Sequence, residues 1–468
     1  MLKRPHLLLL LALLAALALV VAACAEDDVA DEPEEDTDDE VIDDEDDEVD
    51  DDDADEAAGD VDAITVGALF PQSGDLAFGA ADALEGVEVA VEMFNERGEH
   101  GIEVELVTAD APDPAGGTAG VRQLITQDDV DAVIGTYASA IASAAVPAAE
   151  RLDTLYLETT AFAEAITDGP QNVLRTTISS GDLGSYAAEF ILTGIAEEID
   201  VAEDDMRVAV VYTDDEFGTS IADAALDRFA DSGAELVVEE SYPAATTSDL
   251  SSVLLQIQQT EPHAVVHVAQ VPDGVLFWRQ AQQLDVNMPA VVGAGGGYGQ
   301  IEFAEPLGEN ADGIFNIVPP TSGSINVDSL SEEAQGLLAD MQEKLDEKGY
   351  EQGNYTDWAF MGTWVFLNEV VPNAASADVD GFIDAAQGVA VDPLDSITGF
   401  GFEFAGPDAD NAGQNILANP VVQQWQGGEL VVTYPEELAV SEFVNVPLPD
   451  WDERDEEIQE LEDEEEDE

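Results

Sequence analysis

The chain has 468 residues and carries 105 Asp and Glu against 12 Lys and Arg, a formal net charge of −93. This balance excludes nucleic acid and anionic membrane surfaces as electrostatic partners, because both repel an acidic protein. The only cysteine is Cys24, so an intramolecular disulfide is also excluded.

The first residues predict export. Lys3 and Arg4 precede the apolar run 7–21, which ends in Val-Ala-Ala before Cys24. This run is short for a transmembrane helix and is typical of a secretion signal over residues 1–23. The exit resembles the lipobox of bacterial lipoproteins, which implies cleavage before Cys24 and its acylation. A plain signal with an incidental cysteine is the alternative. Two or more acyl chains attached to Cys24 would anchor the protein to the outer face of the cell membrane.

Two strongly acidic segments flank a less acidic body. Residues 26–62 hold 25 Asp and Glu and no Lys or Arg, so 24–62 is predicted to be a disordered linker that begins with the lipidated cysteine. Residues 450–468 carry 14 more acids, and we expect a disordered tail there. The body between them has Lys344 and Lys348 as its only lysines. Its acidity indicates a halophilic or salt-tolerant source, because salt screens the self-repulsion.

The body is too long for one ordinary core, and its apolar runs alternate with helix-length amphipathic segments. Strands are predicted at 64–70, 102–109, 131–135, 154–157, 173–176, 207–213, 234–241, 264–269 and 290–293. Helices are predicted at 80–97, 115–127, 139–151, 182–198, 216–232, 248–260 and 273–284. After Pro320 the pattern changes, with helices at 331–348, 355–371 and 379–387 and β-like runs at 399–404, 421–425 and 430–433. The alternation predicts parallel sheets covered by helices on both faces.

The body also has two similar halves. Residues 64–96 and 207–230 each comprise a strand, a turn with small and acidic residues, and a long helix containing Ala and Glu. The sequence therefore predicts an α/β fold with two doubly wound lobes.

Several segments carry a family resemblance. Residues 64–74 (ITVGALFPQSG), 90–98 (AVEMFNERG), 131–135 (DAVIG), 174–177 (LRTT) and 278–281 (WRQA) resemble, in order and spacing, the type I periplasmic binding proteins of the leucine/isoleucine/valine-binding group. The resemblance implies Rossmann-like lobes joined by three hinge crossovers. Lobe one would comprise 63–179 plus 319–397, and lobe two 180–318 plus 398–449. Solute would bind in the cleft at the carboxyl ends of the strands.

The resemblance also implies ligand-binding residues in lobe one. Ser139 opens a helix after a strand, where its hydroxyl and free N–H groups could hold a carboxylate; a plain helix cap is the alternative. Thr160, Ala161 and Phe162 match a second carboxylate-binding segment of the family, although a hydroxyl residue is common where Phe162 stands. Phe78 matches an aromatic lid position and could equally belong to the core.

Lobe two departs from the family pattern. Phe217 matches another aromatic position, as lid or as core, and Gln270 replaces an aromatic hydrogen-bonding residue. Ser180 and Gly295 stand where amino-acid-binding members place acids for the ligand ammonium. A buried ammonium without an anion is costly, so an amide, a carboxylate or an aromatic acid is a credible solute besides a branched-chain amino acid, unless Asp182 or Asp214 compensates.

The resemblance implies the solute receptor of an ABC importer, a monomer that delivers solute to membrane permease subunits. A sensor of the same fold, acting on a membrane receptor, is the alternative. An α/β surface hydrolase has no catalytic constellation to support it. His263 and His267 are interpreted as structural, and we expect no metal, cofactor or catalytic residue.

The anchor can be tested by Cys24→Ala. We expect the protein to be membrane-bound with an acylated Cys24 at its N-terminus, and the variant to be released in soluble form. Intact-mass analysis of the membrane fraction measures the modification directly. A different, unmodified N-terminus, or partitioning that the change leaves unaltered, would contradict the lipobox interpretation.

Overall fold

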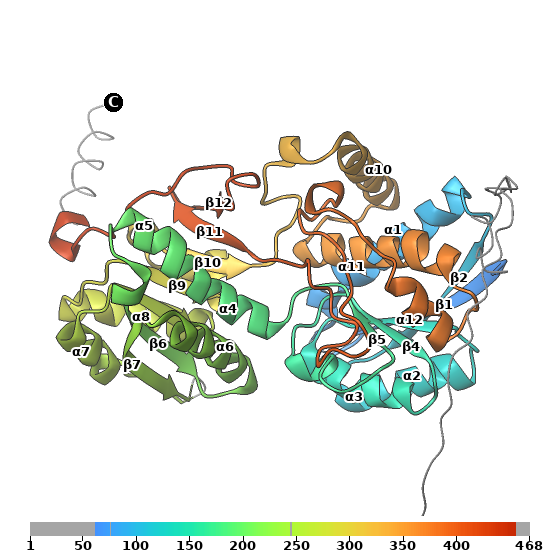
Figure 1. Cartoon of the computed structure of the whole chain (residues 1–468), viewed down its shortest axis with the longest axis horizontal. Coiled ribbons are helices and arrows are strands. Elements are labelled where there is room, and N and C mark those ends of the chain that lie inside the picture. Colours follow the sequence, from blue (N-terminus) through green and yellow to red (C-terminus); the bar gives the residue numbers. More distant parts are fainter. Residues whose placement is uncertain (1–60, 75, 244–245, 455–468) are drawn as a thin grey trace, which may run out of the picture. The chain divides into compact units, whose positions relative to one another are not determined.

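The structure is a computed structural model that describes residues 61–74, 76–243 and 246–454. Cys24, the signal and most of the acidic linker lie outside these residues, as does the chain from 455 onward. The described part forms two sheets, each covered by helices (Figure 1). Within this part of the chain, no helix is both long and apolar enough to cross a membrane.

The first sheet consists of five parallel strands in the order β2-β1-β3-β4-β5. Their bounds are β1 Ala63–Phe70, β2 Glu103–Asp110, β3 Ala132–Gly135, β4 Leu155–Glu158 and β5 Val173–Arg175. Val66 of β1 pairs with Leu106 of β2 and with Ala132 of β3. Because all five strands run in parallel, their carboxyl ends lie at one edge of the sheet.

Helices cover both faces of this sheet. On one face lie α1 (Ala77–Arg97), α10 (Glu332–Lys348), α11 (Asn354–Val365) and α12 (Val379–Ala386), and on the other α2 (Pro114–Thr126) and α3 (Ser139–Glu150). Val66 and Ala68 join the core with α1 and α11, whereas Leu69 joins the core with α2 and α3. This alternation follows from the two-residue period of a strand. A Cβ atom at Gly86 of α1 would lie 2.5 Å from the Thr356 carbonyl oxygen, so only glycine allows α1 and α11 to cross this closely.

The second sheet has seven strands in the order β12-β11-β10-β9-β8-β6-β7. Their bounds are β6 Arg207–Thr213, β7 Glu235–Tyr242, β8 Ala264–Val268, β9 Val291–Ala294, β10 Phe315–Val318, β11 Val421–Gln426 and β12 Glu429–Tyr434. The strands β6 to β10 are parallel, and β11 and β12 are antiparallel. Continuous apolar strands such as β6 suit a sheet that is covered on both faces.

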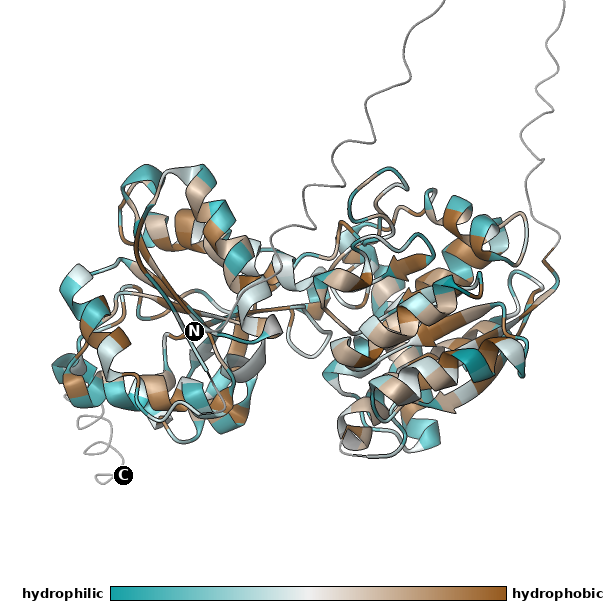
Figure 2. Ribbon diagram, turned by 90° about the horizontal axis from the view of Figure 1, so that it is seen from below, coloured by the Kyte–Doolittle hydropathy of each residue, from teal (hydrophilic) through white to brown (hydrophobic). Residues whose placement is uncertain are grey.

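Four longer helices accompany the second sheet: α4 (Ser180–Phe190), α6 (Glu216–Ser232), α7 (Ser251–Thr260) and α8 (Val271–Leu284). The short α9 (Ile301–Ala304) follows β9, and α4 continues through a wide turn into α5 (Ala196–Glu198). Val208 and Val210 of β6 share a core with α4 and α6, and Ala209 and Val211 share one with α7 and α8. Figure 2 shows the apolar strands beneath helices that carry polar residues on their outer faces.

These elements confirm the predicted fold class: two parallel-dominated α/β lobes between which the chain passes three times. It leaves the first sheet after β5, returns between β10 and α10, and crosses again between α12 and β11. Most predicted elements lie within about three residues of the observed ones. The strand β10 was not predicted. The predicted β-like run 399–404 is not a strand and makes only isolated bridges, at Phe402 and Phe404.

Part of the third crossover pairs with the last strand of the first sheet, and the lobe boundary at 397 stays a prediction. Arg175 of β5 donates its backbone N–H to the Gly413 carbonyl at 2.9 Å and accepts from the Asn415 N–H at 2.9 Å. Gly413 has a φ of +76°, and a Cβ atom there would lie 1.9 Å from the Val173 carbonyl oxygen. Residues 413–415 therefore extend the edge of the first sheet before the chain reaches β11.

The described residues beyond 449 pack against lobe two. Residues 451–454 form a helical turn, and the side chain of Trp451 is only 6% exposed. Its indole N–H donates to the Val286 carbonyl at 3.0 Å, and its ring packs edge-on against Trp278. Arg454 lies over the Trp451 ring at 4.6 Å. The folded body thus extends to Arg454, and an acidic composition concealed this buried turn.

Removal of this indole tests the contact. We expect Trp451→Ala to lower the free energy of unfolding by about 3–5 kcal/mol, because a large buried side chain leaves a cavity. Asp452→Ala, an exposed change in the same turn, is the control and should have little effect. Urea denaturation in molar salt measures both variants. Equal stability of the two would show that the turn does not pack as described.

Candidate functional site

The loops after β3 and β4 meet at the carboxyl edge of the first sheet. Ser139 is the first residue of α3 and is half-buried. Its Oγ accepts the backbone N–H groups of Phe162 at 3.3 Å and Ala163 at 3.2 Å. The helix cap is Ala138, which makes no side-chain capping bond, so Ser139 does not act as a plain cap. Because its oxygen accepts, the Ser139 hydroxyl keeps its hydrogen to donate elsewhere.

Glu158, the last residue of β4, was not singled out from the sequence. Its side chain is 0% exposed. Its two oxygens each lie 2.9 Å from the Thr136 backbone nitrogen. Its Oε1 also accepts from the N–H groups of Thr160 at 3.0 Å and Ala161 at 2.9 Å. The backbone donors of the predicted carboxylate-binding segment thus bind a carboxyl group of the chain itself.

The Glu158 carboxyl group is fully buried and forms no salt bridge within the described part of the chain. Burial raises the pKa of the Glu158 carboxyl to about 8. The hydrogen bonds from Thr160, Ala161 and Thr136 lower this pKa, as does the charge of Arg175 on β5, but burial has the larger effect. Burial and the neighbouring Glu158 also raise the pKa of the Tyr156 hydroxyl on β4.

Thr160 itself is only 1% exposed, and its hydroxyl donates to the Thr136 carbonyl oxygen. This bond joins the loop after β4 to the loop after β3. Phe162 is half-buried and its ring packs edge-on against Trp358 of α11. The structure therefore brings Ser139, Thr160, Ala161 and Phe162 together, as the sequence predicted, and leaves their contact with a solute as a prediction.

Ser180 opens α4 beside the same loop. Its N–H donates to the Phe162 carbonyl at 2.8 Å, and its hydroxyl lies 3.4 Å from Glu164 Oε1. Glu164 also accepts from the Gly181 N–H. Asp182 instead closes a capping box with Ser179, so it caps the helix. The acid that lies beside Ser180 is therefore Glu164, which is 16 residues away in the sequence and has no local pattern that would link the two.

Two of the lobe-two residues lie together. Phe217 is half-buried at the start of α6, and a Cβ atom at Gly295 would lie 3.6 Å from its ring. Gly295 has a φ of +61°, a conformation that favours glycine. Gln270 is exposed and caps α8, where its N–H donates to Asp273 Oδ1 at 3.1 Å. For Phe78, in the first turn of α1, the side chain lies outside the described part.

The histidines of lobe two have structural surroundings. His267 is 0% exposed, with Nε2 2.9 Å from the Tyr242 hydroxyl and Nδ1 2.6 Å from the Tyr298 hydroxyl. Burial lowers the pKa of His267 to about 3, so the imidazole is neutral at physiological pH. Tyr242 in turn donates to Asp273 at 2.6 Å, which ties the start of α8 to the sheet. Within residues 61–454 as described, no cluster of His, Cys, Asp and Glu has the arrangement of a metal site.

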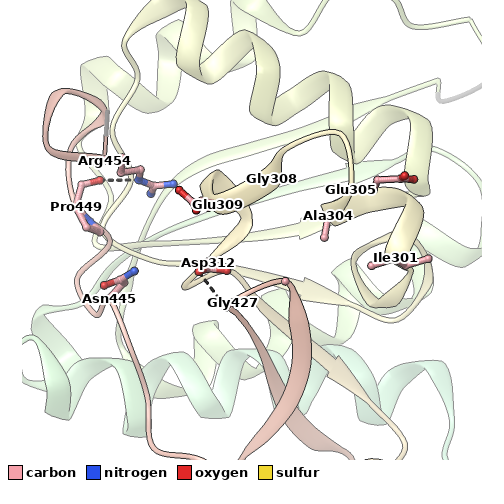
Figure 3. A pocket seen from close by; sticks show the side chains of 11 residues that line it. Ile301, Ala304, Glu305, Gly308, Glu309, Asp312, Gly427, Asn445, Pro449 and Arg454 are labelled. Carbon is pink, nitrogen blue, oxygen red and sulfur yellow. Dashed lines mark hydrogen bonds between the residues drawn. The ribbon is translucent and has the colours of Figure 1, made fainter. Parts of the chain in front are cut away.

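A cavity of about 460 Å³ lies elsewhere, between α9, the β11–β12 turn and the carboxyl-terminal turn (Figure 3). Its wall includes Glu309, Asp312 and Arg454. The Arg454 guanidinium is held by the Pro449 and Asn310 carbonyls at 2.9 and 3.2 Å. Because β11 runs antiparallel to β10 and ends here, this cavity lies at the edge of the sheet opposite Phe217 and Gly295. It is therefore not the predicted solute site.

Comparison with known proteins agrees with this architecture. A family model described as a periplasmic binding protein matches residues 63–425. The Leu/Ile/Val-binding protein homolog 7 of Brucella abortus (strain 2308) is 31% identical over 385 residues, covering 81% of this chain and 93% of the relative. Homolog 8 of Brucella suis biovar 1 (strain 1330) is 28% identical over 387 residues, covering 81% and 92%.

Solved structures share the fold at lower identity. A putative branched-chain amino acid ABC transporter protein of Silicibacter pomeroyi has a TM-score of 0.67 at 16% identity, with 83% of this chain and 100% of that chain covered. The binding protein LivJ of Streptococcus pneumoniae, in complex with isoleucine, has a TM-score of 0.59 at 20% identity (80% and 100% covered). A solute-binding protein of R. palustris, in complex with 4-hydroxybenzoate, has a TM-score of 0.56 at 18% identity (84% and 99% covered).

Two α/β lobes, three passes of the chain and polar loops at the carboxyl edges define a two-lobed solute-binding protein. The chain belongs to the type I periplasmic binding proteins, in the Leu/Ile/Val-binding protein family. This is a family of extracytoplasmic substrate-binding proteins of ABC transporters and not an enzyme family.

The raised pKa of Glu158 predicts how stability depends on pH. Its ordinary value is 4.5, so between about pH 4.5 and 8 the folded state holds a proton that the unfolded state has lost. Stability contributed by Glu158 is therefore present at low pH and falls as pH rises, by up to about 1.4 kcal/mol per pH unit. We expect Glu158→Gln to flatten this slope, as measured by urea denaturation at several pH values in molar salt.

The matched control is Glu150→Gln, an exposed change at the end of α3 in the same lobe. It removes one negative charge and should leave the wild-type slope in place. A slope that Glu158→Gln shares with the wild type would show that Glu158 does not titrate between the two states as described.

Proposed function

We propose that this chain is the solute-binding lipoprotein of an ABC importer, anchored by Cys24 and acting as a monomer. It captures a small polar solute between its lobes and delivers it to the permease subunits. The observation that carries the proposal is the convergence of Ser139, the Thr160 loop and the start of α4 at the carboxyl edge of lobe one. The family and its transporter relatives support the importer role. The acidic surface fits a high-salt environment outside the cell.

The solute is proposed to be branched-chain amino acid-like, an amide or a carboxylate. Relatives named for leucine, isoleucine and valine support the first, and the fold neighbour that holds 4-hydroxybenzoate supports an aromatic acid. In lobe two, Phe217, Gly295 and Gln270 are proposed to complete the site, with Phe78 from lobe one. Closure of the two lobes around the solute would be the state that the permease recognises.

The site offers few acidic side chains that could bind the ammonium group of an amino-acid solute. Ser180 and Gly295 carry no charge, and Asp182 is used as a helix cap. Glu164 is exposed and already accepts from the Gly181 N–H and lies near the buried Arg175, whose pKa is lowered by burial and raised by Glu164. A single acid that is shared with a cation and a helix N-terminus is a weak partner for an ammonium, which favours solutes without an α-amino group.

The Ser139 hydroxyl tests the site. We expect Ser139→Ala to lower solute affinity about ten- to a hundredfold, or about 1–3 kcal/mol, because the ligand loses a hydrogen-bond donor in a closed cleft. Ser143→Ala, about one helical turn further along α3 and half-buried, is the control. Calorimetry would compare leucine and glutamate with short carboxylates, amides and aromatic acids. Tight leucine binding that survives Ser139→Ala would overturn both the site and the solute class.

A further inference from the structure

The loops that face the proposed solute close around a carboxyl group of their own chain. The N–H of Thr136 comes from the loop after β3, and those of Thr160 and Ala161 come from the loop after β4. All three point at Glu158. Converging backbone N–H groups of this kind form an anion-binding concavity. Here the concavity is already occupied by a side chain that is 0% exposed.

The occupied concavity holds the two loops as one unit. The Thr160 hydroxyl donates to the Thr136 carbonyl, and Ser139 Oγ accepts from Phe162 and Ala163. A buried carboxyl group lowers the stability of the fold unless hydrogen bonds satisfy its oxygens. If these N–H groups turned from Glu158 to a solute, the Glu158 oxygens would be left buried and unbonded. The donors on Glu158 are therefore committed to the fold.

We propose that Glu158 is an internal carboxyl group that fills the carboxylate-binding concavity of lobe one, so that the site selects solutes with an uncharged acceptor head group, such as an amide, over the matching carboxylate. This inference rests on the proposed solute-binding function for its second half. Glu158 acts as a positioning residue: it does not touch the solute but determines which donors remain.

The Ser139 hydroxyl is a side-chain donor that remains at this edge. It is half-buried, and its oxygen already accepts two N–H groups, which leaves its hydrogen for a ligand oxygen. One hydroxyl donor matches a single carbonyl oxygen of an amide. A carboxylate brings two acceptor oxygens and a charge toward loops whose Thr160 and Ala161 N–H groups already bind Glu158. The buried cation beside these loops, Arg175, already donates to Gln414, Ala163 and Thr167.

The occupied concavity is tested without any solute. Glu158→Ala empties it, so the variant should melt at a lower temperature than the wild type. In the test, sodium formate replaces part of the sodium chloride while the total salt concentration stays at the same molar value. Formate is a small carboxylate that can bind the N–H groups that Glu158→Ala leaves unbonded. We expect formate to raise the melting temperature of Glu158→Ala by several degrees and to leave the wild type unchanged. Constant salt is needed because the acidic surface also responds to ionic strength.

Glu158→Gln is the matched control, because its side chain still fills the space and keeps one acceptor oxygen. It should show no response to formate. Formamide in place of formate should restore little of the stability of Glu158→Ala. If formate stabilises Glu158→Ala no more than chloride or formamide does, the internal carboxyl proposal is overturned. Refolding of an unstable Glu158→Ala by formate counts as support.

Selectivity is measured by calorimetry with two pairs of matched probes: isovaleramide with isovalerate, and 4-hydroxybenzamide with 4-hydroxybenzoate. We expect the wild type to bind the amide of at least one pair more tightly than its carboxylate. In formate-free buffer, Glu158→Ala should shift that preference about tenfold or more toward the carboxylate. A wild type that prefers the carboxylate, or a preference that Glu158→Ala leaves unchanged, overturns the selectivity proposal. If formate rescues Glu158→Ala but the wild type binds no probe, the proposed solute class fails while the internal carboxyl stands.

Discussion

The buried guanidinium of Arg175 joins the segments on which the carboxyl edge of lobe one depends. Its side chain is 0% exposed, bonds to Gln414, and donates to the Ala163 carbonyl at 2.6 Å and to Thr167 Oγ1 at 3.1 Å. Ala163 belongs to the loop after β4, and Gln414 belongs to the third crossover. A buried cation requires such partners, because it has lost its hydration. One side chain thus couples the proposed site to the passage between lobes.

Amide side chains of the third crossover extend this junction. Gln414 donates to the Thr177 carbonyl and Asn415 to the Thr176 carbonyl, each at 2.9 Å. Thr176 and Thr177 lie in the first crossover, immediately before α4. Two of the three passes are therefore held together by buried hydrogen bonds on lobe one. A hinge of this construction leaves the segments beyond it, toward α4 and β11, as the places where lobes can change their relative orientation.

Three cations of this acidic chain, Arg97, Lys344 and Lys348, join α1 to α10. Lys344 of α10 lies 2.9 Å from Glu96 of α1, and Lys348 lies 2.9 Å from Glu92. Arg97 bonds to Asp340 at 2.7 Å. Each such pair contributes little by itself in salt solution. Together these pairs attach α10 to α1. Without them, the acidic side chains on this surface would repel each other.

The sequence by itself determined the elements, the two lobes and the family, because these depend on local periodicity and on the order of motifs. The family resemblance also assigned Ser139 and the Thr160 loop to one ligand cleft. Only the tertiary structure decided that Glu158 is buried against their N–H groups, that Glu164 lies beside Ser180, that residues 413–415 extend β5, and that Trp451 packs on Trp278. The physical reason is that an acid at a strand end or a tryptophan in an acidic tail has the same local pattern in water as in a core. Its environment is set by contacts that are far apart along the chain.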